Sequence, residues 1–235
     1  MMHALLERLV LLVKRRSIVV DRRISSAYLL GLFVSKFLMA CRGMIRLRRM
    51  KLAFIGSGVT LKEVGKIEYG PGLVIDQGCF VDALSCEGIR FGTAVSLNKQ
   101  IIIECTGSLT NIGKGLVIGD NVGLGAGCFL GCAGGIEIGT DTIIGNFVSF
   151  HSENHNFDNP DLPIRQQGVS RQGIRVGKNC WIGAKVTVLD GAVIEDGCVF
   201  AAGAVVAAGI YRKNSIYGGV PAKFIKSRVV EEGVA

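Results

Sequence analysis

Hydrophobic residues return every six positions between residues 112 and 206. The series consists of Ile112, Ile118, Leu124, Leu130, Ile138, Ile144, Phe150, Val176, Ile182, Val188, Ile194, Phe200 and Val206. A glycine or alanine usually follows the apolar position, and a small or β-branched residue often lies four places after it. A period of six fits neither an α-helix nor an ordinary strand meander. It is typical of a parallel β-helix, in which short strands alternate with tight corners.

A looser copy of the pattern lies upstream and extends the predicted β-helix. Its apolar positions are Ile75, Val81, Phe91, Leu97, Ile103 and Leu109. Each hexapeptide supplies one face of a narrow prism, three close a coil, and coils stack along one axis. The 33 glycines among 235 residues suit the corners, where backbone passes close to backbone. We therefore predict an all-β domain over residues 52–210, a helical segment over 1–51 and a tail over 211–235.

The regular spacing fails at two places. Leu130 and Ile138 are two residues too far apart, which predicts a widened corner around Cys132 to Gly135. Phe150 and Val176 are separated by 26 positions where six are expected, which predicts an inserted loop over residues 151–173. The insertion is polar and contains two of the three histidines and two of the four prolines. A loop on a rigid scaffold is a common place for functional residues.

The basic charge of the chain is confined to its N-terminal segment. Residues 1–51 contain 12 Lys and Arg residues and two acidic residues, a balance of +10, whereas the remainder has 15 basic and 17 acidic residues, a balance of −2. The basic residues are not interleaved with stacking aromatic residues and match no nucleic-acid-binding motif. Nucleic acid is therefore not an expected partner.

The same N-terminal segment is strongly apolar and is expected to form two helices. They could cap the open end of the prism or pack in an oligomer, as solenoid ends require. They could instead form a cationic amphipathic patch on an anionic membrane. The longest uncharged run, Ile24 to Ser35, is shorter than the roughly 20 apolar residues that span a bilayer. No small-residue cleavage site of a secretory signal follows the apolar runs.

Eight cysteines raise the question of disulfides or a metal site: Cys41, Cys79, Cys86, Cys105, Cys128, Cys132, Cys180 and Cys198. Four of them lie four places after a ladder residue, where the repeat requires a small inward side chain. There is no pair of CxxC motifs at zinc spacing. We interpret the cysteines as small hydrophobes, which predicts a reducing, cytoplasmic location.

Three further features carry a resemblance to a known family. They are the histidine-containing loop, the run Cys180-Trp-Ile-Gly-Ala-Lys-Val-Thr-Val-Leu189 and the ending Gly218-Gly-Val-Pro-Ala-Lys-Phe-Ile-Lys226. With the ladder, they resemble the left-handed β-helix (hexapeptide-repeat) acyltransferases over roughly residues 55–228. Within these, the chain is most similar to sugar O-acetyltransferases of bacterial surface-polysaccharide synthesis, with galactoside and maltose acetyltransferases as cousins. The resemblance implies a homotrimer that uses acetyl-CoA as co-substrate and a glycan or sugar precursor as acceptor.

The resemblance also implies a catalytic base. The spacing from Ile138-Gly139 to the loop histidine matches the galactoside enzymes when His155, not His151, is taken as the base. Its imidazole would remove a proton from a sugar hydroxyl during direct attack on the thioester, since histidine titrates near neutral pH. Glu153, Asp158 or a backbone carbonyl could orient the ring.

Other site residues follow from the same matching. The acceptor-binding residues that it implies are His151, Asn154, Phe157, Asp158 and Trp181. The residues implied for CoA are Trp181, Ala184, Ala202, Ala207, Lys223 and Lys226. The family often has Thr-Lys where this chain has Ala207-Ala208, so Arg212 or Lys213 is a possible substitute for one phosphate contact.

Alternatives from other classes stay open at this point. A metal-dependent lyase of the γ-carbonic anhydrase kind shares the β-helix, but it needs three histidine ligands and the prism region holds only His151 and His155. No metal is therefore expected. A non-catalytic scaffold would bind no CoA, and an amino sugar or a small molecule could replace the hydroxyl acceptor. The basic, apolar N-terminus favours a lipid-linked or membrane-proximal glycan.

Overall fold

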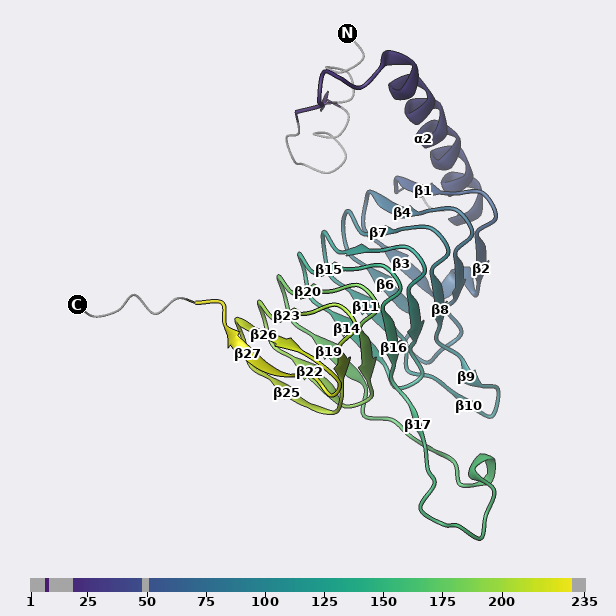
Figure 1. The fold of residues 1–235 in the computed structure, drawn as a ribbon. Coiled ribbons are helices and arrows are strands. Elements are labelled where there is room, and N and C mark those ends of the chain that lie inside the picture. Colours follow the sequence, from purple (N-terminus) through teal and green to yellow (C-terminus); the bar gives the residue numbers. More distant parts are fainter. Residues whose placement is uncertain (1–6, 9–18, 48–50, 230–235) are drawn as a thin grey trace, which may run out of the picture.

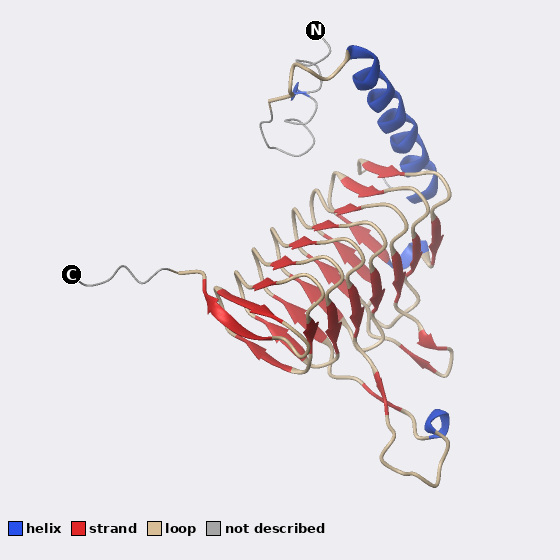
Figure 2. Cartoon of the chain, viewed as in Figure 1, coloured by secondary structure: helices blue, strands red, loops and turns tan. Residues whose placement is uncertain are grey.

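Three parallel sheets wrap around a single axis and form the body of the molecule (Figures 1 and 2). The structure is a computed structural model that describes residues 7–8, 19–47 and 51–229. Each turn of the chain contributes one strand to each sheet, and the sheets have nine, seven and seven strands. Seven coils are complete, and β26 begins an eighth. The predicted parallel β-helix is confirmed.

The strands are short, as the six-residue period requires. Sheet A contains β1 (Ala53–Ile55), β4 (Leu73–Ile75), β7 (Ser96–Leu97), β12 (Gly123–Leu124), β15 (Ile143–Ile144), β20 (Trp181–Ile182), β23 (Val199–Phe200), β26 (Ser215–Gly218) and β27 (Lys223–Ser227). Sheet B contains β2 (Thr60–Lys62), β5 (Phe80–Asp82), β8 (Ile102–Glu104), β13 (Phe129–Gly131), β16 (Ser149–His151), β21 (Thr187–Leu189) and β24 (Val205–Val206). Sheet C contains β3 (Ile67–Tyr69), β6 (Ile89–Phe91), β11 (Leu116–Ile118), β14 (Ile136–Ile138), β19 (Ile174–Val176), β22 (Ala192–Ile194) and β25 (Gly209–Tyr211). A 3-10 turn, η1 (Val64–Lys66), precedes β3.

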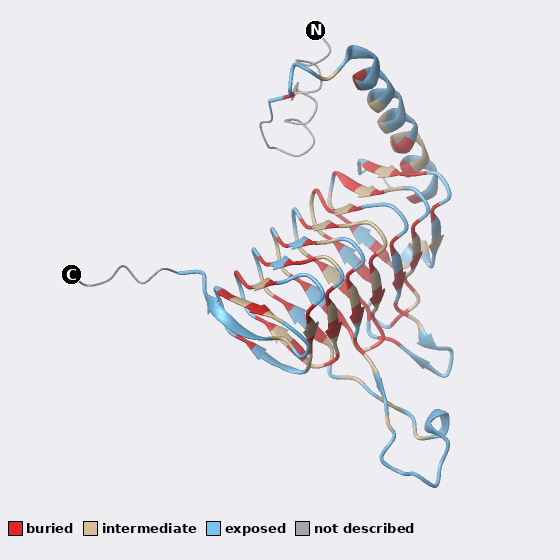
Figure 3. Cartoon of the chain, in the orientation of Figure 1, coloured by how far each residue is buried: buried red, intermediate tan, exposed pale blue. Residues whose placement is uncertain are grey.

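The ladder residues stack on one another inside the prism. In sheet C, Ile118 pairs with Ile138 and Ile138 pairs with Val176, so that equivalent side chains form a column. Sheet B forms another such column, in which Leu130, Phe150 and Val188 are all buried. Figure 3 shows these columns as buried positions along every coil. Burial of apolar surface along the whole axis supplies the main stabilising term.

Two predicted ladder positions are wrong. Leu109 is 84% exposed and Ile112 is 38% exposed, although the six-residue count places both inside the prism. Residues 107–112 instead form an antiparallel hairpin of β9 (Gly107–Ser108) and β10 (Asn111–Ile112), which leaves the third coil between β8 and β11. The tight turn of the hairpin is closed by the Ser108 hydroxyl, which accepts a hydrogen bond from the Asn111 N–H (3.1 Å).

The C-terminal end of the prism is closed by aromatic rings and by a reversed strand. The rings of Phe200, Tyr211 and Tyr217 lie with centroids 5.0 to 5.3 Å apart, and Phe224 contacts Tyr217 at 6.0 Å. Strand β26 continues sheet A in parallel with β23, and β27 then pairs with β26 in the antiparallel sense. The coil therefore continues past residue 210, where we expected the tail to begin.

The N-terminal end of the prism is covered by one long helix. Helix α2 (Ser26–Leu47) packs against β1 through its C-terminal part (Figure 1). The other helix expected in residues 1–51 would lie largely outside the described residues. In length and apolar composition α2 is sufficient to cross a membrane, which the length of the uncharged run did not indicate.

All eight cysteines are free, and Cys79, Cys128, Cys180 and Cys198 are buried as expected. Burial raises the pKa of the Cys128 and Cys198 thiols to about 11, which keeps them protonated and unreactive at neutral pH.

Candidate active site

Three departures from the regular repeat lie above one another at a single corner of the prism. This corner joins sheet B to sheet C. It carries the β9–β10 hairpin in the third coil, the widened turn at residues 132–135 in the fourth coil and the long insertion in the fifth. We call the insertion, residues 151–173, the histidine loop. Its outer part extends away from the prism next to the hairpin (Figure 1).

The start of the histidine loop is fixed to the widened corner by a buried serine. The Ser152 hydroxyl donates a hydrogen bond to the Gly131 carbonyl (2.7 Å) and accepts one from the Gly134 N–H (2.9 Å). A Cβ atom on Gly134 would lie 1.9 Å from the Ser152 carbonyl oxygen, so this position requires glycine. The widened corner at residues 132–135 and the start of the histidine loop therefore pack together as one unit.

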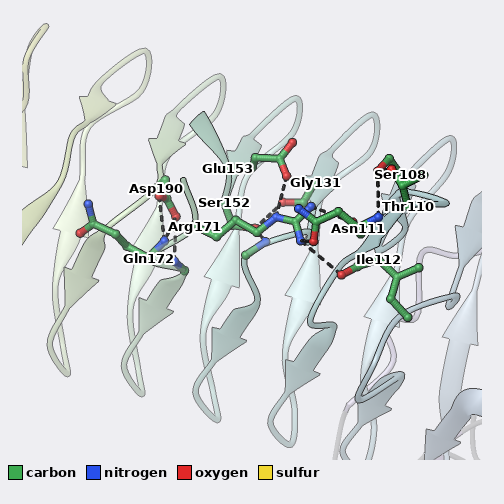
Figure 4. Close-up of polar contacts among 12 residues, drawn as sticks. Ser108, Thr110, Asn111, Ile112, Gly131, Ser152, Glu153, Arg171, Gln172 and Asp190 are labelled. Atoms are coloured by element: carbon green, nitrogen blue, oxygen red, sulfur yellow. Dashed lines mark hydrogen bonds and ion pairs between the residues drawn. The ribbon is translucent and has the colours of Figure 1, made fainter. Parts of the chain in front are cut away.

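The two arms of the histidine loop and the hairpin are joined by Arg171. Its Nε donates to the Glu153 carboxylate at 2.7 Å. Its two terminal nitrogens donate to Asn111 Oδ1 (3.0 Å), the Asn111 carbonyl (3.0 Å) and the Ile112 carbonyl (3.2 Å) (Figure 4). The side chains of Arg171 and Glu153 are only 19% and 26% exposed, so the pair is partly shielded from solvent. The planar guanidinium suits this geometry because its donors point in several fixed directions at once.

The end of the histidine loop is held by a buried carboxylate from the next coil. Asp190 is 2% exposed and accepts hydrogen bonds from the N–H groups of Gln172 and Gly173, the shortest at 2.7 Å (Figure 4). Backbone N–H groups that bond a carboxylate satisfy its charge inside the protein. Both ends of the loop are thus attached to the rigid prism.

The outer part of the histidine loop has its own internal order. Strand β17 (Asn154–His155) pairs antiparallel with β18 (Val169–Ser170), so that His155 lies opposite Val169. A 3-10 turn, η2 (Ile164–Gln166), lies between these two strands. The Gln167 amide donates to the carbonyls of Asn159 and Leu162, both at 2.8 Å, and closes the tip of the loop on itself.

The proposed base and the acceptor residues of the loop are accessible. Asn154, His155, Phe157 and Asp158 are all exposed, and Phe157 is 70% exposed. Glu153 is engaged by Arg171, which makes it an anchor of the loop rather than a free partner for an imidazole. In the described part of this chain, no hydrogen bond holds the His155 ring.

His151 occupies a different environment from His155. It ends β16 on the outer face of sheet B, with its ring 5.4 Å from the ring of Phe129. Partial burial lowers the pKa of the His151 imidazole, because desolvation disfavours the charged form. This position at the base of the loop suits a neutral side chain in contact with an aromatic ring.

Most of the residues expected to bind CoA lie together on another face. Trp181 is 56% exposed on sheet A. In register with it, Val199, Ile216 and Lys226 follow on the next three strands, which places Lys226 about 14 Å from Trp181 along the column. Ala184 and Ala202 stack in the corner after β20 and β23, where the Gly203 N–H donates to the Ala184 carbonyl (2.9 Å). Lys223 lies at the start of β27 and is exposed.

Ala207 is separated from this group. It follows β24 in sheet B, so it lies at the corner between sheets B and C, and its carbonyl accepts a hydrogen bond from the Tyr211 hydroxyl (3.1 Å). His155 and Trp181 also belong to different faces of the same chain. Arg212 and Lys213 lie beyond β25, where their N–H groups bond to the Tyr217 hydroxyl and to Glu195.

Sequence reasoning missed the residues that hold the histidine loop in place. Arg171 and Asp190 contact partners 17 to 60 positions away, so no local motif marks them. Gln167 lies within the loop, but only the folded loop shows its role. Within the described ranges, no group of three His, Cys, Asp or Glu side chains is arranged to hold a metal ion.

The known proteins that this chain is similar to are named as transferases. Residues 173–208 match the family described as bacterial transferase hexapeptide (six repeats). WbbJ of Escherichia coli K12, named as an O-acetyl transferase of lipopolysaccharide biosynthesis, is 31% identical over 161 residues, covering 65% of this chain and 81% of WbbJ. Rv3034c of Mycobacterium tuberculosis, named as an acetyltransferase, is 38% identical over 113 residues, covering 48% of this chain but only 37% of Rv3034c.

A solved structure shares the fold. AntD, an N-acyltransferase from Bacillus cereus in complex with dTDP and 3-hydroxybutyryl-CoA, aligns with a TM-score of 0.51 and 20% identity over 75% of this chain and 80% of AntD. At this identity the similarity concerns the fold alone. The three sheets, the six-residue ladder and the identity to WbbJ over most of its length agree. The chain therefore belongs to the left-handed β-helix, hexapeptide-repeat acyltransferases.

Proposed function

We propose that the protein transfers an acetyl group from acetyl-CoA to a hydroxyl of a sugar during the synthesis of a surface polysaccharide, such as O-antigen, capsule or exopolysaccharide. The observation that carries the proposal is the 31% identity to WbbJ across 81% of that protein, because WbbJ is named for this type of transfer. The exposed His155 on an anchored loop supplies a chemical group that such a reaction needs.

His155 acts as the general base in this proposal. One imidazole nitrogen accepts the proton of the sugar hydroxyl while the sugar oxygen attacks the thioester carbonyl. The tetrahedral intermediate then collapses, the carbon–sulfur bond breaks, and the departing thiolate takes the proton back from the imidazolium. A thioester is already activated, so a covalent enzyme intermediate is not required. Because Ser152, Arg171 and Asp190 fix the base of the loop, the backbone that carries His155 is already attached to the rigid prism before a substrate binds.

The complete site requires neighbouring subunits. In one chain, His155 projects from the corner between sheets B and C, whereas Trp181 and Lys226 lie on sheet A. A homotrimer would set the histidine loop of one subunit beside sheet A of the next and join the two half-sites. Size-exclusion chromatography with light scattering would test this, because a monomer at assay concentration would contradict it.

Sheet A has suitable features for the CoA half of the site. The exposed face of Trp181 offers a flat apolar surface, and backbone groups of Ala184 and Ala202 line the adjoining corner. The ammonium groups of Lys223 and Lys226 can pair with phosphate at the far end of the column. The free cysteines fit a reducing compartment, so we place the reaction in the cytoplasm.

The decisive experiment joins a binding measurement to a turnover measurement. Titration calorimetry of the full chain with CoA and acetyl-CoA would be run beside a thiol-release assay on sugars, nucleotide-linked sugars and lipid-linked oligosaccharides. Binding of CoA together with release driven by a hydroxyl acceptor supports the proposal. Release driven only by amino sugars would replace it with N-acyl transfer, the activity named for AntD. No binding of CoA at any concentration would contradict both reactions.

A further inference from the structure

Helix α2 has two apolar sides, and the prism covers only one of them. Met39, Gly43 and Leu47 are buried on the side that faces β1. The approach is close, because a Cβ atom on Gly43 would lie 2.1 Å from the Ala53 carbonyl oxygen. This side of the helix therefore belongs to the core of the protein and caps its N-terminal end.

The other side of α2 forms a continuous apolar stripe. At about 100° per residue, its members fall within an arc of about 140° around the helix axis. Along the helix, the stripe extends from Leu30 to Ile45. We name this surface the apolar stripe; it comprises Leu30 (54% exposed), Phe33 (39%), Val34 (49%), Phe37 (62%), Leu38 (47%), Cys41, Met44 (59%) and Ile45 (74%). No charged residue falls inside the arc. Figure 3 shows this helix as mostly exposed along its length, unlike the prism.

The charges around the stripe are cationic. Helix α2 contains no acidic residue, and its cations Lys36, Arg42 and Arg46 all lie outside the arc. Over residues 1–51, 12 Lys and Arg residues stand against two acidic residues. An exposed apolar surface bordered by net positive charge is complementary to an anionic lipid surface, whereas another cationic copy of itself would repel it.

The attachment of α2 to the prism determines how it can meet a bilayer. Arg42 donates to the Ile55 carbonyl (3.4 Å) and Arg46 donates to the Val59 carbonyl (2.6 Å). A helix that crossed the bilayer over its whole length, Ser26–Leu47, would have to leave β1, exposing the end of the core and separating Arg42 and Arg46 from their carbonyl partners. A helix that lies in the interface keeps these contacts and still buries the stripe.

We propose that the apolar stripe of α2 inserts into the surface of an anionic membrane while the helix remains attached to β1, so that the enzyme is held on one leaflet. The inference is independent of which acceptor the enzyme uses. The histidine loop leaves the fifth coil, four coil spacings or about 19 Å along the axis from β1. The apolar stripe and the histidine loop thus occupy separate parts of the molecule.

The test is flotation of the full chain with preformed vesicles, either of phosphatidylcholine alone or of phosphatidylcholine with phosphatidylglycerol. The variants are Phe37→Glu, in the middle of the stripe, and Ser35→Glu, a matched control with the same charge change on the same helix but outside the stripe. Thermal unfolding checks that each variant folds. Phe37 and Ser35 are both exposed, so neither substitution disturbs the core.

The wild-type chain and Ser35→Glu are expected to float with the anionic vesicles, and raised salt should weaken this binding. Phe37→Glu should bind about tenfold more weakly or worse, because it removes an aromatic ring that the membrane would bury and adds a charge to the stripe. Absence of wild-type binding, or equal binding by wild type and Phe37→Glu, would overturn the proposal. The stripe would instead be a contact between subunits if the wild-type chain did not bind vesicles and Phe37→Glu dissociated an oligomer that the wild-type chain forms.

Discussion

The prism and the histidine loop are stabilised in opposite ways. Inside the prism, side chains such as Phe150 and Val188 are buried completely and stack on equivalent residues in adjacent coils. The histidine loop buries little apolar surface and is held by a few polar anchors at its base, namely Ser152, Arg171 and Asp190. Stability and chemistry therefore reside in separate residues, so that substitutions should affect one property without the other.

The largest effect is expected in the prism. Phe150→Ala would remove a fully buried ring from the column of sheet B and leave a cavity that neighbouring coils cannot fill. The free energy of unfolding should fall by about 3–5 kcal/mol, measured by chemical denaturation. Phe157→Ala provides the control, because that ring is 70% exposed in the histidine loop. Equal losses from the two variants would erase the distinction between the regions.

The next largest effect is expected for His155, whose replacement should reduce activity without reducing the stability of the fold. His155→Ala should lower kcat by about 100-fold or more, as expected for removal of a general base, while the affinity for CoA and the free energy of unfolding stay nearly unchanged. Steady-state kinetics and calorimetry on the same preparation measure both quantities. If His155→Ala kept full activity while His151→Ala lost it, the assignment of the base would be wrong.

Arg171 tests whether the anchors of the loop matter for the position of the base. Arg171→Ala would break the contacts to Glu153, Asn111 and Ile112 together, and we expect kcat to fall by about tenfold through misplacement of the imidazole. Arg171→Lys should recover only part of this activity, since an ammonium can pair with Glu153 but cannot match the fork of donors. The pH profile of kcat should keep its shape, because Arg171 takes no part in proton transfer. A profile that moved would assign Arg171 a different role.

The smallest effect is a dependence of stability on pH. Burial lowers the pKa of His151 below its ordinary value of 6.5, so the unfolded chain binds a proton more readily than the folded one. This contribution is fully present above pH 6.5 and is lost as the pH falls through the lowered pKa of the folded state. Because His151 is partly exposed, solvent screening keeps this change small. Tm measured between pH 5 and about 8 should fall less steeply in His151→Gln than in the wild type.

The sequence predicted the parts of the fold that repeat. Ile138, Ile144 and Phe150 lie where the six-residue count places them, because each coil copies the geometry of the coil below. Leu109 and Ile112 were misplaced because the count continues to match residues after the chain has left the prism. A period records spacing and carries no information about where a hairpin begins.

The candidate site was predictable only in part, for a related reason. The 26-residue gap after Phe150 reveals the histidine loop, because an insertion interrupts the ladder. Arg171 contacts Asn111, and Asp190 contacts the backbone of Gln172 and Gly173. These contacts join different coils, so no local sequence motif predicts them. The opposite placement of His155 and Trp181 likewise depends on which sheet each strand joins, which only the folded prism shows.

The antiparallel strand β27 affects whether one molecule can associate with another through the end of sheet A. A stack of parallel strands ends in a row of unpaired backbone groups, and such an edge is a template on which another chain can grow. In sheet A that edge is occupied by β27, which runs against the direction that a further coil would need. Helix α2 covers the opposite end. The edge of sheet A is thereby closed to a further parallel coil, and removal of β27 should expose β26 as a template on which other chains can pair.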